Sequence, residues 1–152
     1  MITVWGRATS SNTQAVLWAL AEIGLPFERI DAGGMYGRLD TPEFAAIGPH
    51  RLVPVPGDDD LTLWESGAIV RYLGARYGDA SFWPADPAAR AGIDKWAEWM
   101  KTTFVPAFLT GIFWPAMQAA RVAPDPAASA KAVARMKQVA AILDDGVPEA
   151  GY

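Results

Sequence analysis

The sequence contains no cysteine and a single histidine, His50. Without cysteine the chain can have no disulfide, no thiolate metal site and no catalytic thiol of its own. One histidine argues against a Ser-His-Asp triad and against a histidine-rich metal site. No bound metal is therefore expected.

Clustered basic residues and long apolar runs are also missing. The 13 Lys and Arg are outnumbered by 17 Asp and Glu, which gives a net charge of −4. Nucleic-acid binding typically needs clustered Lys and Arg, so that class of partner is not expected. No apolar run reaches about 18 residues, and no basic-then-apolar signal peptide opens the chain. We expect a cytoplasmic protein without a membrane partner.

Short apolar runs alternate with helix-start signals in the first half of the chain. They predict strands at 2–5 and 27–31, a hairpin of strands near 53–55 and 61–64, and helices from the cap residues 9–12 to Gly24, from Thr41-Pro42 to Ile47 and from Ser66 to Gly78. A βαβ unit joined to a ββα unit makes a four-stranded mixed sheet with helices packed on it. The expected fold class is α/β, with a thioredoxin-like N-terminal domain.

The second half of the chain has a different composition. Residues 79–89 carry two prolines and indicate a linker between a domain at 1–78 and an all-helical domain at 90–152. Helices are predicted at about 90–108 and 127–143. Proline in a helix interior removes a hydrogen bond, so Pro106 and Pro115 are expected to kink or break the first run.

The N-terminus of the helix that begins at Glu65-Ser66 is a candidate binding site. Free backbone N–H groups and the positive end of the helix dipole favour an anion at its N-terminus. A ligand ammonium would pair with Glu65, so the two together match the head of an α-amino acid. The alternative is that Ser66 is a helix N-cap and nothing more, which would stabilise the helix by about 1 kcal/mol.

Two prolines, Pro54 and Pro56, fall in the predicted hairpin. A proline at the start of a strand predicts a cis Val53–Pro54 bond in a tight bend. Such a bend would present the backbone of Val53 to an extended ligand, in the manner of an added strand. The alternative for Pro54 is an ordinary edge-strand proline. Pro56 is expected to interrupt the strand after Val55.

Several segments together resemble the glutathione transferase family, in particular its soluble bacterial members. They are S-S-N-T-Q-A-V-L-W-A-L (10–20), L-D-T-P-E-F (39–44), V-P-V (53–55), W-E-S-G-A-I-V-R-Y-L (64–73) and W-A-E-W-M-K-T-T-F-V-P-A (96–107). The resemblance covers roughly residues 2–117 and carries the expected fold with it.

The resemblance implies roles for individual residues. Glu65 and Ser66 correspond to the pair that binds the γ-glutamyl end of glutathione, and Val53, before the cis-proline Pro54, corresponds to the residue that pairs with the cysteinyl part. Arg51 lies near positions that hold the glycyl carboxylate in some relatives. Leu52 stands where relatives commonly carry a basic residue, so the glycyl end would be held less firmly, or by His50 and Arg51.

The resemblance also places the catalytic hydroxyl within residues 9–12. In serine-type members a hydroxyl donates to the glutathione sulfur, and Ser10 aligns best with it. Lowering a thiol pKa from about 8.5 by two units requires about 2.7 kcal/mol, which one charged hydrogen bond and a helix dipole can supply. Asn12 is expected to assist. Thr9 and Ser11 are alternatives, and so is a purely capping role for all four residues.

The activity implied is conjugation of glutathione, as co-substrate, to a small hydrophobic electrophile bound between the domains, a detoxification reaction. The alternatives are a non-catalytic binding or scaffold protein of the same family, and a glutathione-dependent isomerase, dehalogenase or disulfide reductase. Family resemblance further implies a homodimer. The helical domain ends at Gly151-Tyr152, earlier than is usual in the family, and is expected to be either truncated or a natural short form.

Overall fold

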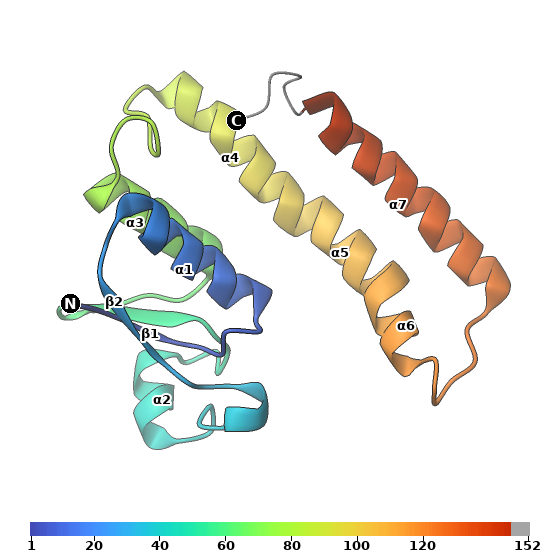
Figure 1. The fold of residues 1–152 in the computed structure, drawn as a ribbon, viewed down its shortest axis with the longest axis horizontal. Coiled ribbons are helices and arrows are strands. Elements are labelled where there is room, and N and C mark those ends of the chain that lie inside the picture. Colours follow the sequence, from blue (N-terminus) through green and yellow to red (C-terminus); the bar gives the residue numbers. More distant parts are fainter. Residues whose placement is uncertain (147–152) are drawn as a thin grey trace. The chain divides into compact units, whose positions relative to one another are not determined.

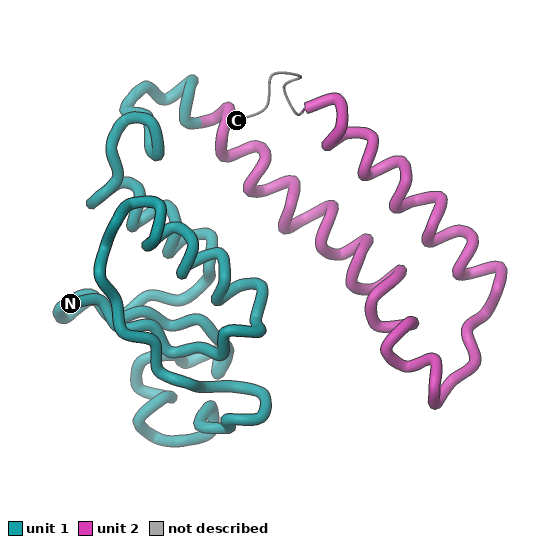
Figure 2. The backbone as a smooth tube through the Cα atoms, in the orientation of Figure 1, with its two compact units in different colours: residues 1–90 teal, residues 91–152 magenta. Residues whose placement is uncertain are grey.

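The computed structural model describes residues 1–146 of the chain. The backbone forms two compact units, Met1–Arg90 and Ala91–Tyr152 (Figure 2). The first unit combines a sheet with helices, and the second consists of helices.

The sheet of the first unit has four strands in the order β2-β1-β3-β4 (Figure 1). Strand β1 (Ile2–Trp5) pairs in parallel with β2 (Phe27–Ile30) and antiparallel with β3 (Val55–Asp58), which pairs antiparallel with β4 (Leu61–Thr62). This confirms the predicted mixed sheet.

Helices α1 (Ser11–Ile23) and α3 (Ser66–Tyr77) pack against each other on one face of the sheet (Figure 1). Helix α1 ends at Gly24, whose left-handed φ of 76° glycine adopts without steric cost. Alternate residues of β1 and the inner faces of both helices form the main core, which consists of Ile2, Val4, Val16, Ala19, Leu20, Ile69 and Leu73.

Helix α2 (Pro42–Ile47) contributes to a second, smaller core. It begins as predicted, with the Thr41 side chain accepting the Phe44 N–H and proline in the first turn. Phe44 is fully buried with Val55, and its ring meets that of Trp5 edge to face. A short 3-10 helix, η1 (Gly34–Tyr36), lies in the glycine-rich segment between β2 and α2.

The expected interruption of the strand at Pro56 is wrong. Strand β3 begins at Val55 and continues through Pro56, which lies opposite Val4 of β1. The Pro56 carbonyl accepts the Leu63 N–H at 3.2 Å, on the side of β4. In an antiparallel pair the backbone N–H and C=O of one residue point toward the same neighbouring strand. The N–H that Pro56 lacks would therefore point toward Leu63, just beyond the end of β4, and away from β1. The proline therefore costs no hydrogen bond to β1.

Helical structure extends from residue 87 to 118 without a break. The segments are α4 (Pro87–Trp99), the π-helical turn η2 (Met100–Phe104), α5 (Val105–Phe108), a second π-helical turn η3 (Leu109–Phe113) and α6 (Trp114–Gln118). Pro106 and Pro115 fall in the first turns of α5 and α6, directly after the wider π turns. A proline is tolerated there because the hydrogen bond it cannot make is not required. The run is therefore not broken at either proline, and the alternative of a kink stays a prediction.

The last described helix, α7 (Pro126–Gly146), belongs to the second unit. Val139 on α7 is fully buried, whereas most side chains of this unit are partly or fully exposed. Across residues 1–146, no helix has the length and apolar character needed to span a membrane.

Candidate functional site

The N-termini of α1 and α3 meet at one place in the first unit. Ser66 Oγ, at the start of α3, donates a hydrogen bond to Asn12 Oδ1 in the first turn of α1 at 3.3 Å. At the opposite end, Ile23 of α1 and Tyr77 of α3 line one surface depression, so the two helices run in parallel. Each helix N-terminus carries about half a positive charge, so this meeting point favours an anion.

Ser66 is the first residue of α3 rather than its N-cap, which corrects the capping alternative. The N-cap position belongs to Glu65, whose backbone has a left-handed φ of 70°. The Glu65 side chain is exposed and makes no capping hydrogen bond. Its carboxylate therefore stands at the mouth of the helix N-terminus, where a ligand ammonium can reach it.

A small pocket of about 40 Å³ lies at this meeting point. Its lining residues are Asn12, His50, Leu52, Val53, Pro54, Glu65 and Ser66. The Val53–Pro54 peptide bond is cis. The structure thus collects the predicted site residues Asn12, Val53, Pro54, Glu65 and Ser66 from three separate stretches of the chain.

His50 adds a polar ring to the pocket wall. Its Nδ1 is buried and has no hydrogen-bond partner among the described residues. The ring centroid lies 5.3 Å from that of Trp64. An unpartnered ring nitrogen at a pocket wall can donate or accept a ligand hydrogen bond, depending on its tautomer.

Ser10 is the N-cap of α1 and is 8% exposed. Its Oγ accepts the Thr13 N–H at 3.4 Å, so the capping role that the sequence suggested is present. A hydroxyl that accepts one hydrogen bond still has its own proton to donate. Ser10 can therefore cap the helix and donate to a ligand atom at once. The neighbouring hydroxyls of Thr9 and Ser11 are on exposed residues.

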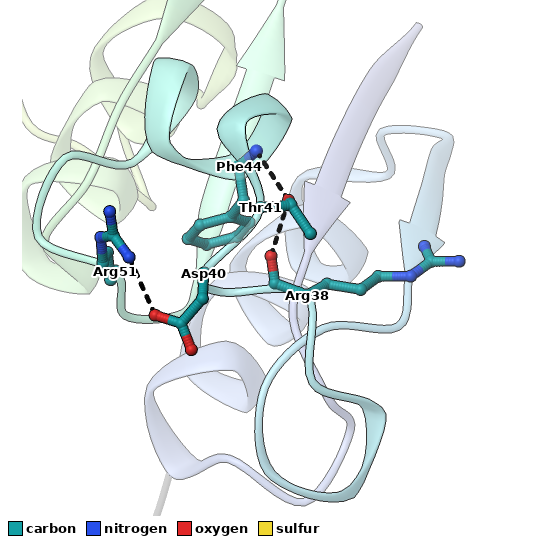
Figure 3. A network of polar contacts seen from close by, with 5 residues as sticks. All are labelled: Arg38, Asp40, Thr41, Phe44 and Arg51. Carbon is teal, nitrogen blue, oxygen red and sulfur yellow. Dashed lines mark hydrogen bonds and ion pairs between the residues drawn. The ribbon is translucent and has the colours of Figure 1, made fainter.

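Arg51 lies outside the pocket. Its guanidinium pairs with Asp40 at 2.9 Å, on the exposed side of the loop that precedes β3 (Figure 3). Both side chains of this pair are largely solvent-exposed. Of the predicted site residues, Arg51 and Ser10 are the two that do not line the pocket.

The second half of α3 is tied to β3 by a polar cluster. The hydroxyls of Tyr72 and Tyr77 both donate to Asp58 Oδ2, at 2.7 and 2.6 Å. Burial raises the pKa of Asp58, but the hydrogen bonds from Tyr77 and Tyr72 outweigh it, so the pKa lies below its ordinary value. The hydrogen bond to Asp58, followed by burial, raises the pKa of Tyr72 to about 12. This cluster holds α3 on the sheet, and with it the Ser66 end.

In the part of the chain that the structure describes, no group of three or more His, Cys, Asp or Glu side chains lies close enough together to hold an ion.

The chain matches known proteins along most of its length. Residues 1–75 match the family model for "Glutathione S-transferase, N-terminal domain". The chain is 49% identical over 105 residues to glutathione S-transferase GstB of Escherichia coli K12, a match that covers 68% of this chain and 50% of that protein. It is 32% identical over 120 residues to glutathione S-transferase 1 of Manduca sexta, covering 78% and 51%. The chain thus spans about half the length of the curated relatives it matches.

Solved structures agree with the sequence matches. The theta class glutathione S-transferase of Xanthomonas axonopodis pv. citri, solved with glutathione bound, superposes with a TM-score of 0.82 at 38% identity, covering 95% of this chain and 69% of that one. A delta-class glutathione transferase of Nilaparvata lugens has a TM-score of 0.86 at 25% identity, covering 98% and 68%. With this fold, these relatives and the meeting of two helix N-termini beside Val53 and Pro54, the chain belongs to the glutathione S-transferase family.

Proposed function

We propose that the protein binds glutathione at the pocket between the N-termini of α1 and α3 and joins it, through its sulfur, to a small hydrophobic electrophile. The observation that carries the proposal is the Ser66–Asn12 hydrogen bond, which joins the two helix N-termini beside Val53 and Glu65. The γ-glutamyl carboxylate would lie at the N-terminus of α3 and its ammonium beside Glu65. The backbone of Val53 would pair with the cysteinyl part.

In this arrangement the Ser10 hydroxyl donates a hydrogen bond to the glutathione sulfur. Its position at the N-terminus of α1 adds the dipole of that helix to the hydrogen bond. Both interactions favour the thiolate over the thiol, and the thiolate is the nucleophile. The thiolate attacks the electrophilic carbon, a carbon–sulfur bond forms, and the leaving group departs with its electron pair.

The decisive test replaces Ser10 by Ala and compares it with Ser11→Ala as a matched control. Loss of a hydrogen bond to a charged acceptor should lower kcat/KM for conjugation to a neutral aryl halide by roughly 10- to 100-fold. The same change should raise the pKa of the bound thiol, read from the pH–rate profile. Because Ser11 is exposed, its replacement should change neither quantity.

The absence of Ser10 from the residues that line the pocket favours a second candidate, a family member that binds glutathione without activating it. In that case the bound thiol keeps its free-solution pKa in the unmodified protein, and Ser10→Ala lowers only the stability, by about 1 kcal/mol. Glu65→Gln should weaken glutathione binding under both candidates. Unchanged affinity in that variant would contradict the assignment of the ammonium to Glu65.

We also propose that two copies of the chain associate in the cytoplasm as a homodimer. Large apolar side chains of the helical unit are exposed, among them Trp114, Met117 and Val122. Exposed apolar surface of this kind is typical of interfaces between proteins. Sedimentation equilibrium measures the association directly, and a monomer at all concentrations would contradict it.

A further inference from the structure

Arg7 lies two residues after the end of β1, in the loop that leads to α1. Its backbone carbonyl accepts the N–H of Ser10 at 3.2 Å, so the two residues belong to one turn. Its side chain is half-buried. The sequence alone gives Arg7 no role, because a single arginine after a strand carries no motif.

The guanidinium of Arg7 has no partner in the described structure. Arg29 is paired with Asp31 and donates to the carbonyl of Gly6, and Arg51 is paired with Asp40. Among the seven arginines of residues 1–90, all of them described, Arg7 alone makes no side-chain hydrogen bond, ion pair or ring contact. The five N–H donors of this guanidinium therefore make no hydrogen bond with the protein and are open to an anionic ligand.

The position of this guanidinium places it beside the candidate site. A Cβ built on Gly33 would lie 3.5 Å from Arg7 Nη1 and 3.5 Å from both Cγ atoms of Val53. Arg7 and Val53 therefore flank the same point of the glycine-rich loop. At Gly34 a Cβ would lie only 3.1 Å from Arg7 Cδ, so the two glycines leave room for the arginine to lie across the loop.

We propose that Arg7 binds a substrate carboxylate at this edge of the site. The inference rests on the proposed function. A planar guanidinium fork matches the two oxygens of a carboxylate, which makes arginine well suited to bidentate recognition. Two sources can supply the group: the glycyl carboxylate of a tripeptide that pairs with Val53, or a carboxylate on the electrophile.

The first arm of the test measures the glycyl carboxylate. Calorimetry compares glutathione with its glycyl monoethyl ester on the unmodified chain, on Arg7→Gln and on Arg38→Gln. If Arg7 holds the glycyl group, the unmodified chain prefers glutathione by roughly tenfold, as expected for a partly exposed charged hydrogen bond. Arg7→Gln should lose that preference. Arg38→Gln is the matched control, since it removes the same charge from a guanidinium that lies over Trp5.

The second arm measures a carboxylate on the electrophile. Iodoacetate and iodoacetamide have nearly the same size and differ in charge, and the chain has no cysteine for them to alkylate. In each reaction the thiolate forms a carbon–sulfur bond and iodide leaves with the electron pair of the broken carbon–iodine bond. If Arg7 holds this group, Arg7→Gln lowers the ratio of kcat/KM for iodoacetate over iodoacetamide by roughly tenfold, and Arg38→Gln leaves it unchanged.

The outcomes separate this inference from the proposed function. A change confined to one arm identifies the source of the carboxylate, and either change supports the inference. If Arg7→Gln alters neither ratio while glutathione binding persists, the inference is overturned and the proposed function stands. If the unmodified chain does not bind glutathione, both fail. Should Arg7→Gln not fold, Arg7→Lys keeps the charge and loses the fork, and unchanged ratios in that variant count equally against bidentate binding.

Discussion

Asp58 accepts two tyrosine hydroxyls on one carboxylate oxygen, and this arrangement gives the stability of the first unit a defined pH dependence. A carboxyl group whose pKa is lowered by folding contributes stability above its ordinary pKa, and that contribution is lost as the pH falls through the folded value. A tyrosine whose pKa is raised behaves in the opposite way. The contribution of Tyr72 is complete below its ordinary pKa of about 10 and disappears as the pH rises to about 12.

Replacing Asp58 by Asn should therefore have a pH-dependent effect. At neutral pH we expect it to lower the free energy of unfolding by about 1–2 kcal/mol, because two hydrogen bonds to a partly exposed charge are weakened. The difference from the unmodified chain should shrink at low pH, where Asp58 is protonated, and again as the pH approaches 12, where Tyr72 ionises. Urea unfolding at a series of pH values measures the difference.

Asp60→Asn is the control for that experiment, since Asp60 is exposed in the same turn and its replacement should have little effect at any pH. A constant difference between Asp58→Asn and the unmodified chain from acid to alkaline pH would contradict the interpretation.

Residues whose role depends on the local backbone alone were predictable from the sequence. Ser10 and Thr41 were expected as helix caps, and both accept the N–H three residues later. The side-chain partners of Ser66 and Arg51 were not predicted, because they come from elsewhere in the chain. Asn12 lies 54 residues before Ser66, and Asp40 lies 11 residues before Arg51. No local pattern marks such pairs.

The packing between α2 and β3 positions the segment of the site that contains Val53 and Pro54. Gly48 ends α2, and the chain passes from there to Val53 and Pro54 before β3 begins. A Cβ on Gly48 would lie 2.8 Å from Val55 Cγ2 and 3.0 Å from Phe44 Cε1. Both of those side chains are fully buried, so neither can move away without disturbing the second core.

Gly48→Ala should therefore destabilise the first unit through overpacking, by about 1–3 kcal/mol. The φ of −132° at Gly48 is open to alanine, so space rather than backbone strain decides the result. Urea unfolding followed by circular dichroism measures the loss, and glutathione affinity should fall with it if the loop before Val53 shifts.

Gly92→Ala serves as the comparison. Gly92 lies within α4, and a Cβ added there would meet no atom within 4 Å, so alanine should be neutral or stabilise the helix by up to about 1 kcal/mol. Equal stability of Gly48→Ala and the unmodified chain would show that α2 and β3 are packed more loosely than their contacts indicate.

Elements with local start and stop signals could be predicted well from the sequence. Strand β1, helix α1 from its serine cap to Gly24, and helix α2 with its Thr-Pro start all lie where the pattern placed them. The interruption predicted at Pro56 and the breaks predicted at Pro106 and Pro115 are absent because the cost of a proline depends on the neighbouring chain. Pro56 faces the end of β4, and Pro106 and Pro115 fall after π turns. Neither circumstance is visible in a window of sequence.

Across the whole molecule, the two units differ in how much apolar surface they bury. Within residues 1–146, the fully buried apolar side chains lie in the first unit except for Val139. Local stability follows the density of buried apolar contacts, so the helical unit should open at a lower free energy than the sheet unit.

Amide hydrogen exchange followed by mass spectrometry tests this difference. Peptides from α4 to α7 beyond residue 91 should exchange faster than peptides from β1, α1 and α3, and urea should unfold the chain in more than one step. Association into a dimer would slow exchange in the helical unit as the protein concentration rises. Equal protection of both units in a dilute monomer would contradict the expectation.

The parallel pairing of α1 and α3 has a consequence for how the site tolerates sequence change. The donors at the two helix N-termini belong to the main chain, and they persist in any variant that keeps both helices folded. Truncating Ser10, Asn12 or Ser66 one at a time should therefore reduce the affinity for an anion without abolishing it, because the backbone donors maintain a residual affinity. This residual affinity allows the side chains around the pocket to diverge during evolution. The capacity to attract a carboxylate or thiolate is then inherited with the fold.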